Sequence, residues 1–233
     1  MSLIFLPCVT GPLASSGQAG TSDPFFSSVV ILSHFDGTNG SQSFVDSSSI
    51  ANNPTTSGSA ALTTTSPLFG TASLQAGSNP VSCSSNPAYA IGTGDFTWEF
   101  AFNTASPSQV SNLCDCGNLG LNPTQDFVIY TLSGSYHYFV AGTDKIVGGS
   151  IPTNTWQRIS VVRISGTTTM FVDGISVGSF SDSTSYVAGL TSIAGAGTGS
   201  SQPTGKFDEW RFTNGVGRYS GNYTPATAPF PDF

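Results

Sequence analysis

Charged side chains are scarce in this 233-residue sequence. Asp, Glu, Lys and Arg make up 8% of it, against about 25% in an ordinary globular protein. Only six residues are Lys or Arg, and they are scattered along the chain. The sequence therefore lacks the basic stripe that binds phosphate backbones or anionic lipid. No apolar run approaches the ~20 residues of a membrane-spanning helix. We expect neither a nucleic-acid partner nor a membrane partner.

The aromatic content excludes a disordered chain. Disorder accompanies high net charge and few aromatics, whereas this chain is 12% aromatic and 38% hydrophobic, with a net charge of −7. The surface must be built from Ser, Thr, Asn, Gln and Gly, which favours a particle surface or an extracellular setting. The length fits one β-sandwich domain, since such domains commonly reach ~200–250 residues.

Cysteine and histidine are too few, and too poorly spaced, for a metal centre. One residue separates Cys114 from Cys116, not the two of a zinc or redox pair. We expect free, partly buried thiols, with a bridge from Cys83 to Cys114 or Cys116 as the alternative. The two histidines lie in strand-like contexts without ligand spacing, so no zinc site is expected.

Residues 1–28 differ from the rest of the chain. An apolar tip is followed by a Gly/Ser/Pro-rich linker and a second apolar pair, and the tip lacks the basic region of a signal peptide. We expect a retained N-terminal arm that either packs on its own domain or docks onto another chain, because exposed apolar side chains are unfavourable in a monomer. The candidate anchoring residues are Leu3, Ile4, Phe5, Leu6, Phe25 and Phe26.

From residue 29 onward the pattern is one of short strands separated by turns. Residues 95–103 alternate, with Phe96, Trp98, Phe100 and Phe102 on one face. Asp-Gly at 173–174 and Ser-Gly at 133–134 predict two hairpins. Further strands are predicted over 29–35, 156–164 and 206–213. No sustained 3.6-residue period is present, so we expect almost no helix. The proline-rich residues 224–233 predict an extended surface tail.

An ordered set of motifs over residues 29–233 resembles the laminin G-like domains of the concanavalin A-like lectin/glucanase superfamily, especially versions found in bacteriophage virion proteins. The motifs are HFDG at 34–37, FG at 69–70, GTGDFTWEF at 92–100, WQRI at 156–159, VR at 162–163, GT at 166–167, FVDG at 171–174, FDEWR at 207–211, NYTP at 222–225 and PFP at 229–231. The resemblance implies an all-β fold, a two-sheet antiparallel jelly-roll sandwich with six or seven strands in each sheet. It does not fix an activity, because function lies in sites grafted on a fold.

The residues argue against an enzyme. Glycoside hydrolysis needs two positioned carboxylates, but the chain has two glutamates, and Glu99 has no second acid two or four residues further on. No Gly-x-Ser-x-Gly elbow or phosphate-binding loop is present. Asp208 has the strand parity of Trp210 and Phe212, so we expect a buried structural acid held by backbone N–H groups or an arginine.

Two kinds of ligand remain open. Laminin G-like domains often hold Ca²⁺ at a loop rim, and oxygens could come from Asp36, Asp46, Asp126, Asp144 and Asp182. No other cofactor is expected. Exposed aromatic side chains could stack on a sugar, and the candidates are Tyr136, Tyr138, Tyr186 and Tyr219, with His137 and Tyr223 beside them.

The leading hypothesis is a non-enzymatic surface protein of a tailed-phage virion: a capsid decoration, fibre or tail-associated adhesin domain. Its expected partners are other virion proteins or sister subunits of a homo-oligomer, reached through residues 1–28, and a host-surface glycan. The alternative is a secreted or cell-surface carbohydrate-binding module.

Overall fold

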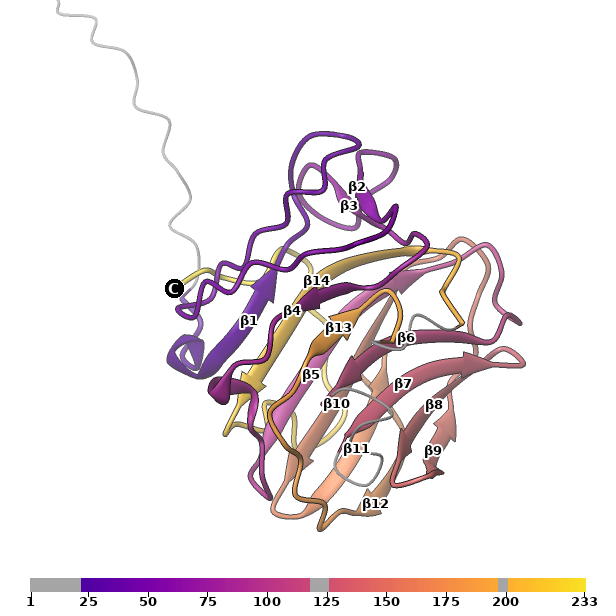
Figure 1. Cartoon of the computed structure of the whole chain (residues 1–233). Coiled ribbons are helices and arrows are strands. Elements are labelled where there is room, and N and C mark those ends of the chain that lie inside the picture. Colours follow the sequence, from indigo (N-terminus) through magenta and orange to yellow (C-terminus); the bar gives the residue numbers. More distant parts are fainter. Residues whose placement is uncertain (1–21, 118–125, 197–200) are drawn as a thin grey trace, which may run out of the picture.

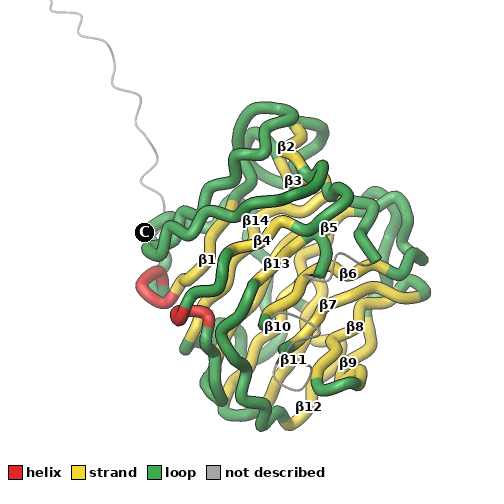
Figure 2. The backbone as a smooth tube through the Cα atoms, viewed as in Figure 1, coloured by secondary structure: helices red, strands yellow, loops and turns green. Residues whose placement is uncertain are grey.

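The computed structural model describes residues 22–117, 126–196 and 201–233. Within these ranges the chain forms fourteen strands and two three-residue 3₁₀ helices, η1 (Phe26–Ser28) and η2 (Pro87–Tyr89). Figure 2 shows how little of the backbone is helical. The near absence of helix was predicted from the missing 3.6-residue period. Neither helix approaches the length needed to cross a membrane, and the search covered the described residues.

The strands form two antiparallel sheets that pack face to face (Figure 1). The eight-stranded sheet has the order β12-β11-β10-β5-β14-β3-β2, with β1 also paired to β14. Its strands are β1 (Val29–Ser33), β2 (Ala61–Thr63), β3 (Ser73–Gln75), β5 (Phe96–Asn103), β10 (Gln157–Ile164), β11 (Thr167–Val172), β12 (Ile175–Ser181) and β14 (Lys206–Asn214).

The six-stranded sheet has the order β4-β13-β6-β7-β8-β9. Its strands are β4 (Val81–Cys83), β6 (Ser111–Cys116), β7 (Phe127–Leu132), β8 (Ser135–Val140), β9 (Thr143–Gly148) and β13 (Thr191–Ile193). The chain enters this sheet at β4, leaves it for β5, returns for β6 to β9, and crosses again around β13. These crossings are typical of a jelly roll, so the predicted fold class is confirmed, with eight and six strands in the two sheets.

The core lies between the sheets and is rich in aromatic rings. Phe96, Trp98, Phe100 and Phe102 of β5 all point into it, as the alternation predicted. The Trp98 ring meets Phe127 of the opposite sheet edge-on, with centroids 5.5 Å apart. Each fully buried large side chain contributes about 1.5–3 kcal/mol, so a chain this poor in charge is held together mainly by these rings.

Two-residue turns set the register of the predicted hairpins. Asp173 and Gly174 have φ values of 50° and 77°, and Ser133 and Gly134 have 53° and 82°. Positive φ at both central residues is the signature of a type I′ turn, whose twist matches that of the paired strands. The turns therefore join β11 to β12 and β7 to β8 as expected.

A bulge in β14 corrects the predicted orientation of Asp208. Glu209 has φ of 52°, and the pairing with β5 shifts between Asp208 and Arg211. Asp208 pairs with Ala101, whose side chain points away from the core. The extra residue changes the parity, so Trp210 and Phe212 face the core while Asp208 lies on the outer face of the eight-stranded sheet.

After β14 the chain runs across that same outer face without helix or strand, as an extended tail (residues 215–233). Tyr223 donates its backbone N–H to the carbonyl oxygen of Gly174, and Arg158 donates to Ala226. The tail ends beside β1 (Figure 1), where the N–H of Asp23 donates to the carbonyl oxygen of Phe233 over 2.7 Å. The two ends of the described chain therefore meet.

The cysteines of the sandwich are buried free thiols. Cys83 and Cys116 both pair with Thr191, so β13 separates them and excludes the bridge that we kept as an alternative. Burial raises the pKa of the Cys83 thiol to about 12 and that of the Cys114 thiol well above its usual range. Cys8 lies outside the described residues.

Candidate functional site

A groove of about 200 Å³ lies on the outer face of the six-stranded sheet. Three neighbouring strands or their flanking segments supply its walls, which are mostly apolar and aromatic. We call it the β7–β8 groove, and its lining residues are Val110, Asn112, Val128, Tyr130 and Phe139.

Strand alternation places these side chains outside. Along β7, Phe127 and Ile129 point into the core, so Val128 and Tyr130 point outward. Along β8, His137 and Phe139 are the outward residues. The register sets Val128 beside Phe139 and Tyr130 beside His137.

The aromatic rings of the groove form a packed platform. Tyr130 stacks on His137 with ring centroids 4.6 Å apart and an angle of 27° between the planes. Phe139 meets Tyr130 edge-on at 6.4 Å. His137 is 7% exposed, whereas Tyr130 and Phe139 stay partly accessible. His137 covers one face of Tyr130, so the remaining surface of Tyr130 and that of Phe139 are what the platform offers a ligand.

The hydroxyl end of Tyr130 is polar. The Tyr130 hydroxyl lies 2.9 Å from both carboxylate oxygens of Asp144, and the His137 Nδ1 lies 3.1 Å from Asp144 Oδ2. Burial and the Asp144 carboxylate raise the pKa of Tyr130 to about 12, so the phenol stays neutral and donates. The Asp144 side chain is 32% exposed, and a carboxylate has about four lone-pair sites, so it retains capacity to accept from a ligand hydroxyl.

A second acid lies at the other end of the same row of residues. Asp115 sits between the core residues Cys114 and Cys116, so it points to the outer face, where it pairs with Val128. Asp115 is buried. Burial and the negative charge of Asp115 raise the pKa of the nearby Asp126 carboxyl to about 6. The apolar floor of the groove is thus flanked by acids on β6 and β9.

Three of the tyrosines predicted to stack on a sugar do not reach the surface. Tyr136, Tyr138 and Tyr186 are buried in the core. The first two have the inward parity of β8, and the Tyr186 ring packs edge-on against the core rings of Phe96 and Phe127. Their hydroxyls bond inside the protein: Tyr136 donates to Gln157, and Tyr138 and Tyr186 share a bond of 2.9 Å. That prediction was wrong for all three. The candidates on β8 included both parities: Tyr136 and Tyr138 point inward, whereas His137 lies on the outer face beside Tyr130. Sequence reasoning missed Tyr130 and Phe139, although the apolar Phe127 and Ile129 on β7 predict an outward Tyr130.

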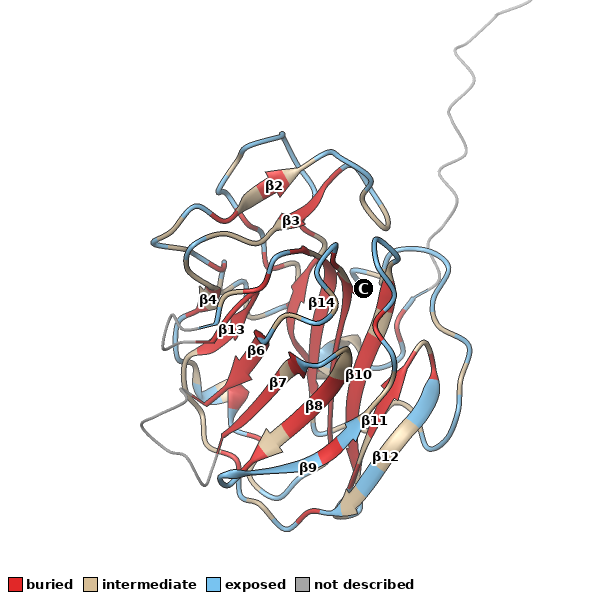
Figure 3. Ribbon diagram, turned by 90° about the vertical axis from the view of Figure 1, so that its right-hand side faces the viewer, coloured by how far each residue is buried: buried red, intermediate tan, exposed pale blue. Residues whose placement is uncertain are grey.

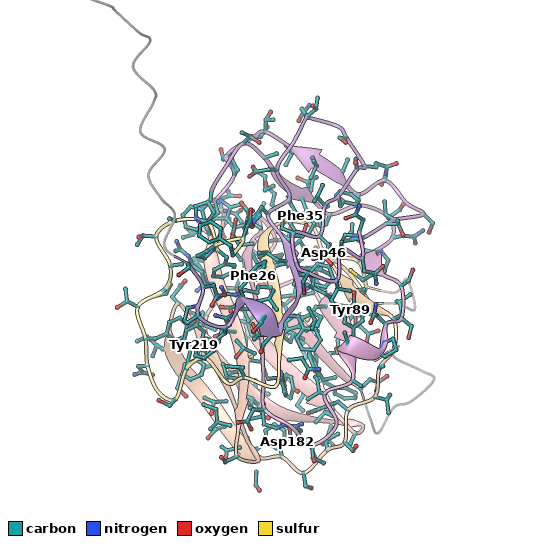
Figure 4. All side chains as sticks on the ribbon, turned by 90° about the vertical axis from the view of Figure 1, so that its left-hand side faces the viewer. Phe26, Phe35, Asp46, Tyr89, Asp182 and Tyr219 are labelled. Carbon is teal, nitrogen blue, oxygen red and sulfur yellow. The ribbon has the colours of Figure 1, made fainter. Side chains whose placement is uncertain are left out.

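Tyr219, the fourth candidate, lies on the tail over the eight-stranded sheet (Figure 4). Its ring stacks on Tyr223 with centroids 3.6 Å apart, and its hydroxyl donates to Glu99. One face is therefore already covered by the protein. Tyr219 is partly exposed but belongs to a different surface from the β7–β8 groove.

The tail covers a cluster of buried charges on the outer face of the eight-stranded sheet, which we call the tail-covered cluster. Arg211 pairs with Glu99 over 2.7 Å and with Asp23 over 3.2 Å. Arg218 pairs with Asp23 over 2.7 Å. Burial opposes ionisation of Asp23, but its hydrogen bonds and the two arginines outweigh that effect and lower its pKa.

The remaining acids of this cluster bond to the tail and to backbone. His34 lies 2.9 Å from Glu209 and 2.7 Å from Asp232. Glu209 also accepts the N–H of Phe230, whose ring lies 3.6 Å below the Arg211 guanidinium. The remaining cavity is about 20 Å³, enough for about one water. The tail therefore fills the sheet face on which Glu99 and Glu209 lie.

Asp208 is held as predicted. Its carboxylate accepts the N–H groups of Leu68, Phe69 and Glu209 at 2.8 to 3.3 Å. Burial and the neighbouring Glu209 charge raise its pKa to about 8. Among the described residues, the hydrogen bonds of this carboxylate come from backbone N–H groups.

The aspartates considered as calcium ligands are dispersed. Asp36 bonds to Thr71, and Asp46 accepts the N–H groups of Leu32 and Ser48. Asp182 accepts the hydroxyls of Thr168 and Tyr186. In the described ranges no group of three or more His, Cys, Asp or Glu side chains could hold a metal ion.

The structure describes two of the six candidate anchoring residues, Phe25 and Phe26. Leu3, Ile4, Phe5 and Leu6 lie outside the described residues. Phe25 is 41% exposed beneath the Arg218 guanidinium. Phe26 is partly exposed at the start of β1 (Figure 4). Both lie where the chain enters the eight-stranded sheet, on the side of the sandwich away from the groove.

Comparison with known proteins identifies the fold. No protein-family model matches this chain, and no curated protein matches it. Solved structures do match. The binding domain of Paraclostridial Mosquitocidal Protein 1 has a TM-score of 0.64 at 13% identity, over 82% of this chain and 50% of that chain.

Botulinum neurotoxin binding domains are also similar. A structure of the type C neurotoxin, reported with cell entry dependent on two ganglioside molecules, has a TM-score of 0.58 at 13% identity, over 82% of this chain and 49% of the other. The serotype D/C binding domain has a TM-score of 0.57 at 12% identity, over 89% and 50%. This chain thus spans about half the length of these solved structures. At such identities the similarity shows the fold alone, an antiparallel two-sheet β-sandwich.

Proposed function

We propose that this protein is a carbohydrate-binding β-sandwich module without enzymatic activity, and that the β7–β8 groove is its binding site. The observation that carries the proposal is the Tyr130 ring, partly exposed in an apolar groove with its hydroxyl on Asp144. Sugars present an apolar ring face and a rim of hydroxyls. An aromatic face beside a carboxylate offers a complement to both.

The structural neighbours support a binding role. The matched structures include toxin binding domains, and cell entry of the type C neurotoxin depends on interaction with two ganglioside molecules. Glycolipid interaction is a property of that protein, of which this chain spans 49%, so it supports a binding role in general and no particular site. The site itself is argued from the groove, since fold does not determine function.

The arrangement of the glutamates supports a non-enzymatic role. A glycosidase needs two carboxylates open to its substrate, with ~5–5.5 Å or ~6.5–9.5 Å between them. Glu99 is paired with Arg211, Glu209 bonds to His34 and Phe230, and the tail covers both. Measured turnover of any polysaccharide by the purified protein would contradict this part of the proposal.

A glycan array with two variants tests the binding site. Tyr130→Ala removes the stacking face and is expected to weaken binding at least about tenfold, the factor equivalent to ~1.4 kcal/mol. Ile175→Ala is the matched control, because Ile175 is an apolar side chain, 56% exposed, on β12 and outside the groove. Equal binding by both variants, or no binding of any glycan by the unmodified protein, would overturn the proposal.

We also propose that the module is displayed on a virion surface, with residues 1–28 as its attachment and homo-oligomer contacts made there. Two observations support this: the phage-like motifs, and the entry of the chain on the face opposite the groove, which leaves the groove pointing away from a particle. Deleting residues 1–22 keeps Asp23 and its ion pairs. The truncated protein, which keeps Phe25 and Phe26, should fold but no longer copurify with particles; copurification would refute attachment through residues 1–22. A secreted module is the alternative, and it would show no particle association in either form.

A further inference from the structure

We infer that the β7–β8 groove selects uncharged sugars and rejects sialylated or otherwise anionic glycans. This inference rests on the proposed function and narrows it. It depends on the charges around the groove and on where the cations of the chain lie.

Among the described residues, the charged side chain that bonds to the groove lining is an acid, Asp144. Asp144 accepts the Tyr130 hydroxyl at one end and is partly exposed. Asp115, beside Val128 in the strand register at the other end, is fully buried and does not line the groove. Asp126 lies close enough to Asp115 for the two carboxyls to interact. A carboxylate or sulfate on a bound glycan would therefore approach the exposed Asp144 carboxylate, with the buried Asp115 and Asp126 carboxyls behind the apolar surface, where water screens charges less than in bulk.

The cations lie elsewhere. Five of the six basic residues belong to the eight-stranded sheet or to the tail over it: Arg158, Arg163, Lys206, Arg211 and Arg218. The sixth, Lys145, follows Asp144 on β9, is exposed, and is not part of the groove lining. Anion recognition relies on Arg forks or on clustered Lys, and the groove lining has neither.

The size and chemistry of the groove fit one neutral sugar ring. Its volume of about 200 Å³ is below the ~300–1,000 Å³ of typical pockets for larger ligands. Val110, Val128 and Phe139 line it with apolar surface, and Val110 is 49% exposed. The ring face would lie on Tyr130, and hydroxyls at its edge would donate to Asp144. A ganglioside, whose headgroup is sialylated, would meet the wrong charge here.

The test uses pairs of glycans that differ only by a terminal sialic acid, immobilised on one array and then measured singly by calorimetry. We expect the neutral member of a pair to bind and the sialylated member to bind at least about tenfold more weakly. Raising the salt from about 20 to 500 mM should narrow the difference, because the screening length becomes shorter than the distances involved.

Two variants sharpen the result. Asp144→Asn keeps an acceptor but removes a charge, so it should reduce the discrimination between paired glycans. Lys145→Ala should leave neutral-sugar binding unchanged. Equal or tighter binding of sialylated members would overturn the inference while leaving the proposed function intact, and loss of that binding in Lys145→Ala would identify the cation responsible. Silence of the whole array would overturn the proposed function and this inference with it.

Discussion

Replacing His34 with glutamine should change how the stability of this protein depends on pH. The His34 imidazole, just after β1, contacts Glu209 of β14 and Asp232 of the tail. Burial alone lowers the pKa of His34, but the hydrogen bonds and charges of the two acids outweigh it and raise the pKa to about 9, from an ordinary value of 6.5. Glutamine has no charge in this range.

The size and sign of the effect follow from that shift. A rise from 6.5 to about 9 corresponds to roughly 3 kcal/mol of stability. Asp232 is 55% exposed, so water screens its share and Glu209 contributes most. The folded state binds the proton more tightly than the unfolded chain. The stabilisation is therefore present in full below pH 6.5 and is lost as pH rises through 9.

The assay is urea unfolding of both proteins between pH 5.5 and 10. Asp126 and Asp208 also titrate in or near this range, but their contributions are common to both proteins and cancel in the difference. The unmodified protein should be more stable by about 2–3 kcal/mol at pH 6, and the gap should close above pH 9. A constant gap across the range would refute the reasoning. Carboxypeptidase digestion of the tail should accelerate over the same pH interval.

Three further results are expected. Arg163→Met should lower the free energy of unfolding by on the order of 3–5 kcal/mol in urea, because Arg163 is fully buried and donates to the carbonyl oxygens of Gly92, Gly94 and Thr184; a loss under ~1 kcal/mol would contradict that role. Gly174→Ala should lower the Tm by several degrees more than Gly166→Ala, although both glycines have φ near +77°. A Cβ on Gly174 would lie 1.9 Å from the Tyr223 carbonyl oxygen, whereas a Cβ on Gly166 would have no atom nearer than 3.8 Å; equal Tm shifts would exclude the clash. In a Cys8→Ser variant, a thiol reagent should find no reactive cysteine until urea is added, because burial raises the pKa of each remaining thiol; rapid labelling of the native protein would count against this burial.

The sequence was sufficient for the fold because its signals were local. The alternation of β5 and the Asp173-Gly174 turn depend on neighbouring residues alone, and both were confirmed. Short strands such as β4 and β13 carry three residues each and leave no detectable period. Their existence depends on pairing with distant strands, which sequence patterns do not contain.

The candidate site was harder to predict, for two physical reasons. In β8, Tyr136 and Tyr138 alternate with His137 and Phe139, and either pair is hydrophobic enough to face the core. Hydrophobicity therefore did not show which pair points inward. In β14 one left-handed residue, Glu209, reversed the parity that had been extended from Trp210 back to Asp208. The prediction that Asp208 is held by backbone N–H groups was nevertheless confirmed, because a buried carboxylate requires such partners on either face.

The edge strands of the two sheets are the places where another chain could add a strand. β9 and β12 are largely exposed (Figure 3), and β9 carries Asp144 and Lys145. Charges on an edge oppose pairing with another chain. Strand β9 therefore supplies Asp144 to the groove and also opposes pairing of another chain with the edge of its sheet.

The hydrogen bond between Asp23 and Phe233 makes the described chain almost a closed ring. A few linking residues could join these two positions without disturbing the sandwich, and new termini opened at the Ser133-Gly134 turn would fall in a surface hairpin, where cutting is best tolerated. For the same reason, the stretch from 23 to 233 could be spliced into a loop of an unrelated protein as a pendant. The two junctions would lie side by side, so the host loop would only have to open by the short distance between Asp23 and Phe233.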